Sequence, residues 1–132
     1  MQSLTLTKAQ LQKMIAHVDL CAPLEACGLL AGLNSKVEAT LTVTNQAQST
    51  VRYVMDPIEQ LTAFEWIESN GLDLIGIFHS HPTGPETVSP TDIAQAAYAV
   101  VYVILSRVDN DWRTRSFWIK DGAFSEVALH VM

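Results

Sequence analysis

The sequence predicts a mixed α/β (α+β) domain, in which helices are interspersed among the strands of one sheet. Some segments repeat apolar residues at helical spacing, and others alternate apolar with polar residues. Turn residues and helix-start residues separate these segments at short intervals, without a linker or an internal repeat. The 132 residues are 48% hydrophobic, which suffices for one buried core. We therefore expect a single domain over residues 1–132.

The chain begins with a predicted strand and a predicted helix. Leu4 and Leu6 indicate a short opening strand. Thr7, with Gln10 three residues later, has the pattern of a capping box at a helix start, and Pro23 ends that helix. The apolar face of the helix is expected to consist of Leu11, Met14, Ile15 and Val18.

Three strands are predicted between the end of this helix and residue 55. The apolar run Cys27–Leu33 is typical of a buried strand. Asn34 and Ser35 favour a turn, and residues 37–43 alternate as a half-buried strand does. Residues 51–55 predict a further short strand.

A second helix is expected to begin after Asp56. This residue has the type of an N-cap, with Pro57 at the first helical position and Glu59 at the third. Asn70 and Gly71 are expected to end the helix.

The remaining segments predict a central strand, a loop, a third helix and three late strands. The nearly continuous apolar run over residues 72–78 indicates the central strand. A loop rich in Pro and Gly follows over residues 80–88, and residues 89–92 open the third helix. The late strands, arranged as a meander, are expected over residues 100–105, 113–119 and 124–129.

Charge and hydropathy argue against several classes of partner. The chain has a formal net charge of −6, whereas proteins that bind nucleic acid usually carry a basic surface. It also has no cluster of Lys and Arg residues that would bind an anionic lipid surface. No apolar run could span a membrane, and the first ten residues do not resemble a secretory signal. We expect a cytoplasmic protein with no nucleic-acid or membrane partner. Cys21 and Cys27 are then expected to be thiols, and a disulfide between them is the alternative.

The strongest chemical signal is the pattern H-x-H-x7-S-x-x-D, formed by His79, His81, Ser89 and Asp92. Alternate residues of an extended segment point the same way, so both imidazoles can face one point at the end of the central strand. Asp92, in the first turn of the next helix, can fold back over this strand end. Two histidines and one carboxylate leave a fourth zinc position open for water, which is typical of a catalytic site. Zinc would lower the pKa of that water to ~7.

A metal-dependent hydrolase also needs a group that moves protons. Glu25, just before the buried strand, is the candidate general base and acid. Ser89 could donate a hydrogen bond to the oxyanion that develops on a substrate carbonyl.

Each of these residues also has a simpler interpretation. An isolated H-x-H is commonly packing or surface, and Glu25 alone would be a surface acid. Ser89 and Asp92 alone form a capping box, and the Asp92 carboxylate could cap the helix, bind zinc, or do both with different oxygens. The combination of all five residues favours the metal site.

These residues carry a resemblance to a known family. The segment HSHPTGPETVSPTD resembles the signature of the JAMM (MPN+) metallopeptidases, and PLEACGLLAG resembles the upstream glutamate motif of their small prokaryotic members. The segments RYVMDPIEQ and FSEVAL are also similar, so the resemblance covers roughly residues 14–129. It implies a cytidine-deaminase-like JAB/MPN fold, in which a curved mixed β-sheet is flanked by helices.

The same resemblance implies an activity and roles for the five residues. His79, His81 and Asp92 would bind one Zn²⁺ per chain, Glu25 would be the general acid/base, and Ser89 would stabilise the oxyanion. The family hydrolyses bonds at the C-terminal Gly-Gly of ubiquitin-like proteins, and its small prokaryotic members are linked to β-grasp sulfur carriers. A thin, extended Gly-Gly tail suits a narrow groove beside a sheet edge. We expect hydrolysis of a peptide or isopeptide bond after such a tail.

Three other functions fit the sequence less well. A catalytically silent MPN scaffold would have lost a ligand or the glutamate, and this chain keeps all five positions. A RadC-type protein shares the H-x-H and S-x-x-D run, but the residues around Glu25 and the acidic charge argue against it. A zinc deaminase would need an H-x-E and a P-C-x-x-C pattern, which the sequence lacks.

Three further residues have simple interpretations. Cys27, near the predicted site, is interpreted as a small buried residue. Arg113 and Arg115 alternate beside Trp112 and predict a solvated strand face, and an acidic partner is the alternative.

Overall fold

A closed, strongly curved sheet forms the body of the protein in the computed structural model, which describes residues 3–132. Residues 1 and 2, part of the expected domain, lie outside this range. The elements in chain order are β1 (Ser3–Leu6), α1 (Lys8–Cys21), β2 (Cys27–Leu33), β3 (Lys36–Val43), α2 (Pro57–Ser69), β4 (Asp73–His81), α3 (Pro90–Gln95), β5 (Val101–Val108), β6 (Asp111–Lys120) and β7 (Ala123–Val131). The predicted α/β class, with a curved mixed sheet and flanking helices, is confirmed.

The strands follow the order β1-β3-β2-β4-β5-β6-β7. β4 lies in the middle of this order, antiparallel to β2 and parallel to β5. β5, β6 and β7 form the predicted antiparallel meander. The short β1 closes the sheet, because it pairs in parallel with β7 on one side and with β3 on the other. The sequence did not predict this closure.

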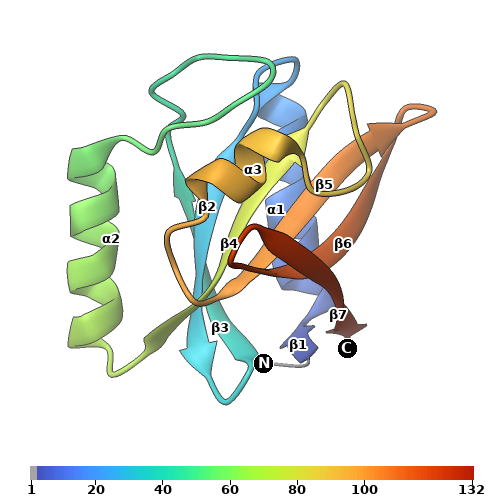
Figure 1. Cartoon of the computed structure of the whole chain (residues 1–132). Coiled ribbons are helices and arrows are strands. Elements are labelled where there is room, and N and C mark those ends of the chain that lie inside the picture. Colours follow the sequence, from blue (N-terminus) through green and yellow to red (C-terminus); the bar gives the residue numbers. More distant parts are fainter. Residues whose placement is uncertain (1–2) are drawn as a thin grey trace.

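Two apolar clusters pack on opposite faces of the sheet, as strand alternation requires. α1 lies against one face, where Met14 and Val18 join Phe78 of β4. α2 lies on the other side (Figure 1), and α3 contributes Ile93 to the cluster there, which also holds Ile77 of β4. His79 and His81 follow Ile77 at alternate positions and therefore face α3.

The predicted helix starts are confirmed at all three helices. Thr7 caps α1 in a capping box with Gln10, and the side chain of Asp56 accepts from two amides at the start of α2. Ser89 and Asp92 form the capping box of α3. Each helix start is a local pattern, in which a side chain that accepts hydrogen bonds is followed by the free amides of the first turn. The sequence alone is therefore enough to locate these starts.

Two predicted elements differ from the structure. Residues 51–55 are not a strand: only Met55 makes an isolated bridge, with Asn45. The Asn45 carboxamide accepts from the amides of Ala47 and Val54, so it binds this segment as an arched loop. β4 also extends to His81, beyond the predicted end at residue 78, because it keeps pairing with β5 as far as Ser106.

The cysteines and the helices agree with two further expectations. Cys21 and Cys27 are both free thiols, so the alternative of a disulfide does not hold. Of the helices formed by residues 3–132, none has the length and apolar character that crossing a membrane requires.

Candidate metal centre

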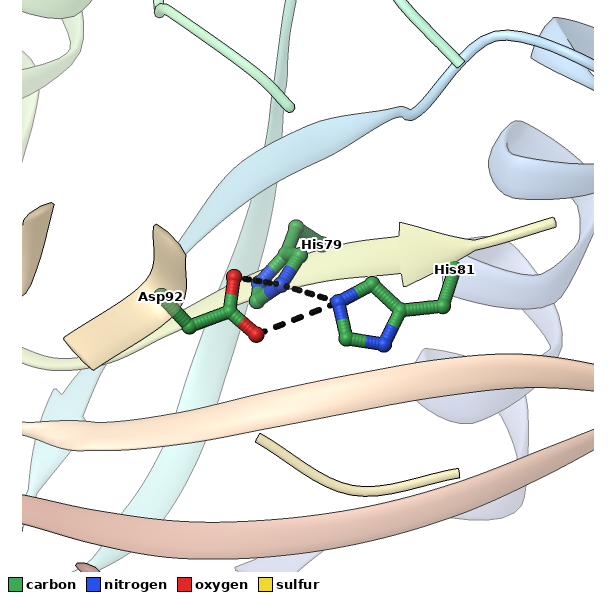
Figure 2. Close-up of side chains that lie close together, drawn as sticks. All are labelled: His79, His81 and Asp92. Carbon is green, nitrogen blue, oxygen red and sulfur yellow. Dashed lines mark hydrogen bonds and ion pairs between the residues drawn. The ribbon is translucent and has the colours of Figure 1, made fainter. Parts of the chain in front are cut away.

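Three buried side chains from β4 and α3 converge on one point (Figure 2). The Nε2 atom of His79 lies 2.9 Å from Oδ1 of Asp92, and the Nε2 atom of His81 lies 3.1 Å from Oδ2. The two Nε2 atoms are themselves 3.1 Å apart. The structure thus brings together the three residues that the sequence predicted as ligands.

This geometry fits a metal ion. Two nitrogens bound to one tetrahedral zinc at about 2.0–2.1 Å would be separated by roughly 3.3 Å, close to the spacing of the two imidazoles. Two imidazole nitrogens and a carboxylate oxygen are a donor set that suits zinc and related transition metals. The residues present are therefore suited to binding a divalent metal.

His81 is oriented by a hydrogen bond on the far side of its ring. Its Nδ1 atom lies 2.8 Å from the carbonyl oxygen of Pro85 and donates to it, which leaves the Nε2 lone pair directed at the metal position. The same carbonyl accepts from the Ser106 hydroxyl at 3.0 Å. The loop after His81 is thereby fixed to β5.

Arg115 holds the same loop from β6. It donates from Nη1 to the carbonyl of Glu86 at 2.8 Å and makes two 2.9 Å contacts with the Glu126 carboxylate. The prediction of a solvated face nevertheless holds for Arg115, because its side chain stays 40% exposed while it makes these hydrogen bonds. It fits Arg113 better, whose side chain is 58% exposed and whose contact with Glu86 is 3.5 Å long.

His79 is held differently from His81. Its Nδ1 atom is buried and has no hydrogen-bond partner among the described residues. Its ring instead packs on Tyr53, with centroids 4.7 Å apart, and meets the His81 ring edge-on at 4.9 Å. Sequence reasoning missed Tyr53, Pro85 and Ser106, because no local pattern distinguishes a tyrosine, carbonyl or serine that meets its partner only in the fold.

The three groups titrate as a coupled set. For Asp92, burial favours the neutral acid, but the hydrogen bonds with His79 and His81 outweigh burial and hold the pKa far below its usual range. Burial lowers the pKa of His79. Burial also acts to lower the pKa of His81, but the hydrogen bond to Asp92 and the charge of Asp92, together with the Pro85 hydrogen bond and Glu25, outweigh it and the net pKa is raised. The ionised carboxylate is thus available as an anionic ligand.

Glu25 supplies a buried carboxyl beside these residues. It is only 3% exposed, and its Oε1 atom has no hydrogen-bond partner within residues 3–132. Burial raises its pKa from 4.5 to about 7, with a smaller opposing effect of His81 and a reinforcing one of Asp92. A carboxyl with a pKa near neutrality can both accept and return a proton, as a general acid/base must.

Ser89 caps α3 as predicted, in a geometry that leaves its hydroxyl hydrogen available for the second predicted role. Its Oγ atom accepts from the Asp92 amide at 3.1 Å, and the Ser89 amide donates to Oδ2 of Asp92 at 2.9 Å. Capping therefore uses a hydroxyl lone pair and leaves the hydroxyl hydrogen free to donate. Asp92 likewise caps the helix and faces the histidines at once.

The remaining candidate near the site has no chemical role in this geometry. Cys27 is fully buried, and burial raises the pKa of its thiol to about 12. A thiol that stays protonated is a poor ligand and a poor nucleophile. The interpretation of Cys27 as a small buried residue is confirmed.

Comparison with known proteins links this geometry to a family. The family described as prokaryotic homologs of the JAB domain matches residues 7–120. The chain is 39% identical over 123 residues to a probable TtuB-protein conjugate cleaving protease of Thermus thermophilus, covering 92% of this chain and 78% of that one. It is 32% identical over 123 residues to a CysO-cysteine peptidase of Mycobacterium tuberculosis, covering 90% and 84%. A solution structure of a protein from Desulfitobacterium hafniense matches 98% of this chain and 92% of that one, with 36% identity and a TM-score of 0.87.

Proposed function

Because this chain belongs to the family of prokaryotic homologs of the JAB domain, we propose that it hydrolyses the peptide or isopeptide bond after the C-terminal Gly-Gly of a ubiquitin-like or β-grasp sulfur-carrier protein. Relatives named for cleaving TtuB conjugates and CysO-cysteine support this substrate class. The observation that carries the chemistry is the convergence of His79, His81 and Asp92 beside the buried carboxyl of Glu25.

We propose zinc, one ion per chain, as the metal, with His79, His81 and Asp92 as its ligands. A bound zinc ion would act as a Lewis acid and lower the pKa of water. Glu25 would take the proton from the attacking water and return it to the leaving amine, for which its pKa of about 7 is suitable. Ser89 would donate its free hydroxyl hydrogen to the oxyanion of the substrate carbonyl.

The first experiment measures metal content by elemental mass spectrometry on the parent, on His79→Ala and on His130→Ala. His130 is exposed and lies outside the site, so its variant is the matched control. We expect about one zinc per chain in the parent and in the control, and none in His79→Ala. Absence of zinc from the parent after reconstitution would favour the silent MPN scaffold instead.

The second experiment tests turnover on TtuB joined through its C-terminus to a labelled lysine peptide. Glu25→Ala should keep its zinc and lose cleavage, because only proton transfer is removed. His81→Ala should lose both zinc and cleavage. Unchanged cleavage by Glu25→Ala would refute the mechanism, and a full zinc complement in His81→Ala would refute the ligand assignment.

Two further proposals concern the chain as a whole. We propose that residues 1–132 form one domain, because one closed sheet connects the described strands. We also propose a cytoplasmic location, because both cysteines are free thiols, as is usual in a reducing compartment. Recovery of the protein in the cytoplasmic fraction of its own host would test the location.

A further inference from the structure

Ser80, between the two histidines, makes an unusual connection to the strand that carries Glu25. β2 and β4 pair antiparallel up to Cys27 opposite His79. One step further, the Ser80 amide donates to the carbonyl of Ala26 at 3.0 Å, as a regular ladder requires. The Ala26 amide, however, donates to the Ser80 hydroxyl at 2.8 Å instead of to the Ser80 carbonyl. A side chain therefore makes the last hydrogen bond between these two strands.

The position of this hydrogen bond is next to the proposed general base. Ala26 directly follows Glu25, and both Ala26 and Ser80 are buried. The backbone of Glu25 is held on its other side, where its amide donates to the Ser49 carbonyl and its carbonyl accepts from Asn45. The Ser80 hydroxyl is thus the side-chain contact that ties the Glu25 segment to the strand of the metal ligands.

Ser80 cannot act on the metal directly. Strand alternation directs its side chain to the face opposite that of His79 and His81. Its one side-chain hydrogen bond goes to Ala26, so the hydroxyl reaches the site through the Glu25 segment. Loss of the hydroxyl would leave the buried Ala26 amide without an acceptor, so the segment would shift to find another partner.

We propose, resting on the function proposed above, that Ser80 is a positioning residue whose hydroxyl fixes the Glu25 carboxyl relative to the metal ligands. A displacement of a reacting group by about 1 Å can lower a rate by about 100-fold. Turnover should therefore depend on this hydroxyl even though metal binding does not.

The test compares Ser80→Ala with Ser116→Ala. Ser116 is also buried, and its hydroxyl also makes one hydrogen bond to the backbone, at 2.7 Å to the Val127 carbonyl between β6 and β7. Both variants should unfold at lower denaturant concentration, because each loses a buried hydrogen bond. We expect only Ser80→Ala to lose kcat on the TtuB–lysine-peptide conjugate, by about 10- to 100-fold, with KM and zinc content near those of the parent.

Two further variants separate positioning from a general structural role. Ser80→Thr keeps the hydroxyl and should recover most of the lost kcat. On the slow residual cleavage that Glu25→Ala retains at high enzyme concentration, Ser80→Ala should cause no further loss, because the hydroxyl acts through Glu25. If Ser80→Ala does not fold, Ser80→Cys, which keeps the size but is a weak acceptor, replaces it. Three results would overturn the proposal. They are a parental kcat in Ser80→Ala, a loss of kcat in Ser116→Ala equal to that in Ser80→Ala, and losses of kcat that add up when Ser80→Ala is combined with Glu25→Ala.

A measurement without substrate distinguishes failure of this inference from failure of the proposed function. Amide hydrogen exchange of Ala26, followed by NMR, should be faster in Ser80→Ala than in the parent, and parental in Ser80→Thr and Ser116→Ala. If the parent cleaves no conjugate but Ala26 exchange changes in this way, the proposed substrate is wrong and the hydroxyl contact stands. Unchanged exchange in Ser80→Ala would overturn the contact itself.

Discussion

At the scale of single residues, Glu25 has an environment that stability alone does not explain. An isolated carboxyl is costly to bury in its ionised form, and Glu25 has one oxygen without a protein partner in the described part of the chain. Proteins that need a proton-transfer group near neutral pH obtain one by such burial. The cost should therefore be visible as a stability that depends on pH.

We predict that Glu25→Gln stabilises the metal-free protein at pH 8 but changes its stability little at pH 4 to 5. The folded pKa of Glu25, about 7, lies above its ordinary value of 4.5. Below 4.5 both states are protonated. Between 4.5 and 7 the unfolded chain ionises first, so the parent loses stability as pH rises, and above 7 the loss stays constant. At about 1.4 kcal/mol per pH unit, the full effect is about 3 kcal/mol.

Urea unfolding of both proteins after metal removal, between pH 5 and pH 8, measures this difference. The other titrating groups of the site are the same in both chains, so they largely cancel. Parallel stability curves over this range would show that Glu25 does not have the raised pKa. In the zinc-loaded parent, kcat should rise with pH as Glu25 ionises, because the base form must accept the proton.

The residues of the site divide into those that sequence could find and those that it could not. His79, His81 and Asp92 follow from two local rules, strand alternation and the position of a helix start. Ser106 contacts the Pro85 carbonyl from 21 residues away, and Ser80 contacts Ala26 from 54 residues away. Such contacts depend on the pairing of distant strands, which no single segment specifies.

At the scale of the elements, the start of α3 serves both folding and chemistry. α3 has only six residues, so its own backbone provides little stability. The Ser89–Asp92 capping box satisfies its first amides and also places the Asp92 carboxylate against both histidines. The position at which this short helix begins therefore serves the capping box and the approach of the Asp92 carboxylate to the histidines together.

We predict that Ser89→Ala lowers both stability and turnover, whereas Thr7→Ala lowers stability alone. Each residue accepts from the third amide of its helix in a capping box, and loss of such a cap costs about 1 kcal/mol. Only Ser89 has a hydroxyl hydrogen available to the substrate oxyanion, and loss of such a donor lowers kcat by about 100-fold or more. Denaturant unfolding and cleavage of the TtuB–lysine-peptide conjugate measure both effects. Equal kcat values in the two variants would exclude the oxyanion role.

Two errors of prediction at this scale have one physical origin. Residues 51–55 have the composition of a strand, but their hydrogen bonds go to Asn45, Gln46 and Ser49 of the same loop rather than to a neighbouring strand. β4 continues through polar residues that sequence assigns to a loop, because β5 offers partners as far as Ser106. In both cases the hydrogen-bonding partners that the fold offers determine whether the segment is a strand, and the intrinsic strand preference of its residues does not.

At the scale of the whole molecule, the site lies beside a close contact between the two central strands of the sheet. Next to the Cys27–His79 pair, Gly28 lies opposite Phe78 and approaches its ring closely. A Cβ atom on Gly28 would overlap the Phe78 ring and lie 2.6 Å from the Leu41 carbonyl oxygen. Phe78 is fully buried and packs against α1, so it cannot move aside. The orientation of the ligand strand thus depends on the core beneath it.

We predict that Gly28→Ala destabilises the fold and lowers zinc affinity, whereas Gly76→Ala does neither to a comparable extent. A Cβ atom on Gly76, in the middle of β4, would lie 3.0 Å from the flexible end of Leu30 and 3.3 Å from both the Leu30 Cβ atom and the Val101 carbonyl oxygen, so its contacts are looser than those at Gly28. Overpacking against a rigid core ring costs about 3 kcal/mol, while a side chain that can rotate costs about 1 kcal/mol or less. Urea unfolding with zinc titration of both apoproteins compares the two positions. Because the Gly28–Phe78 pair adjoins Cys27 and His79, the lost stability and the lost affinity should appear together. A Gly28→Ala protein of parental stability and affinity would show that the central strands can separate without disturbing the site.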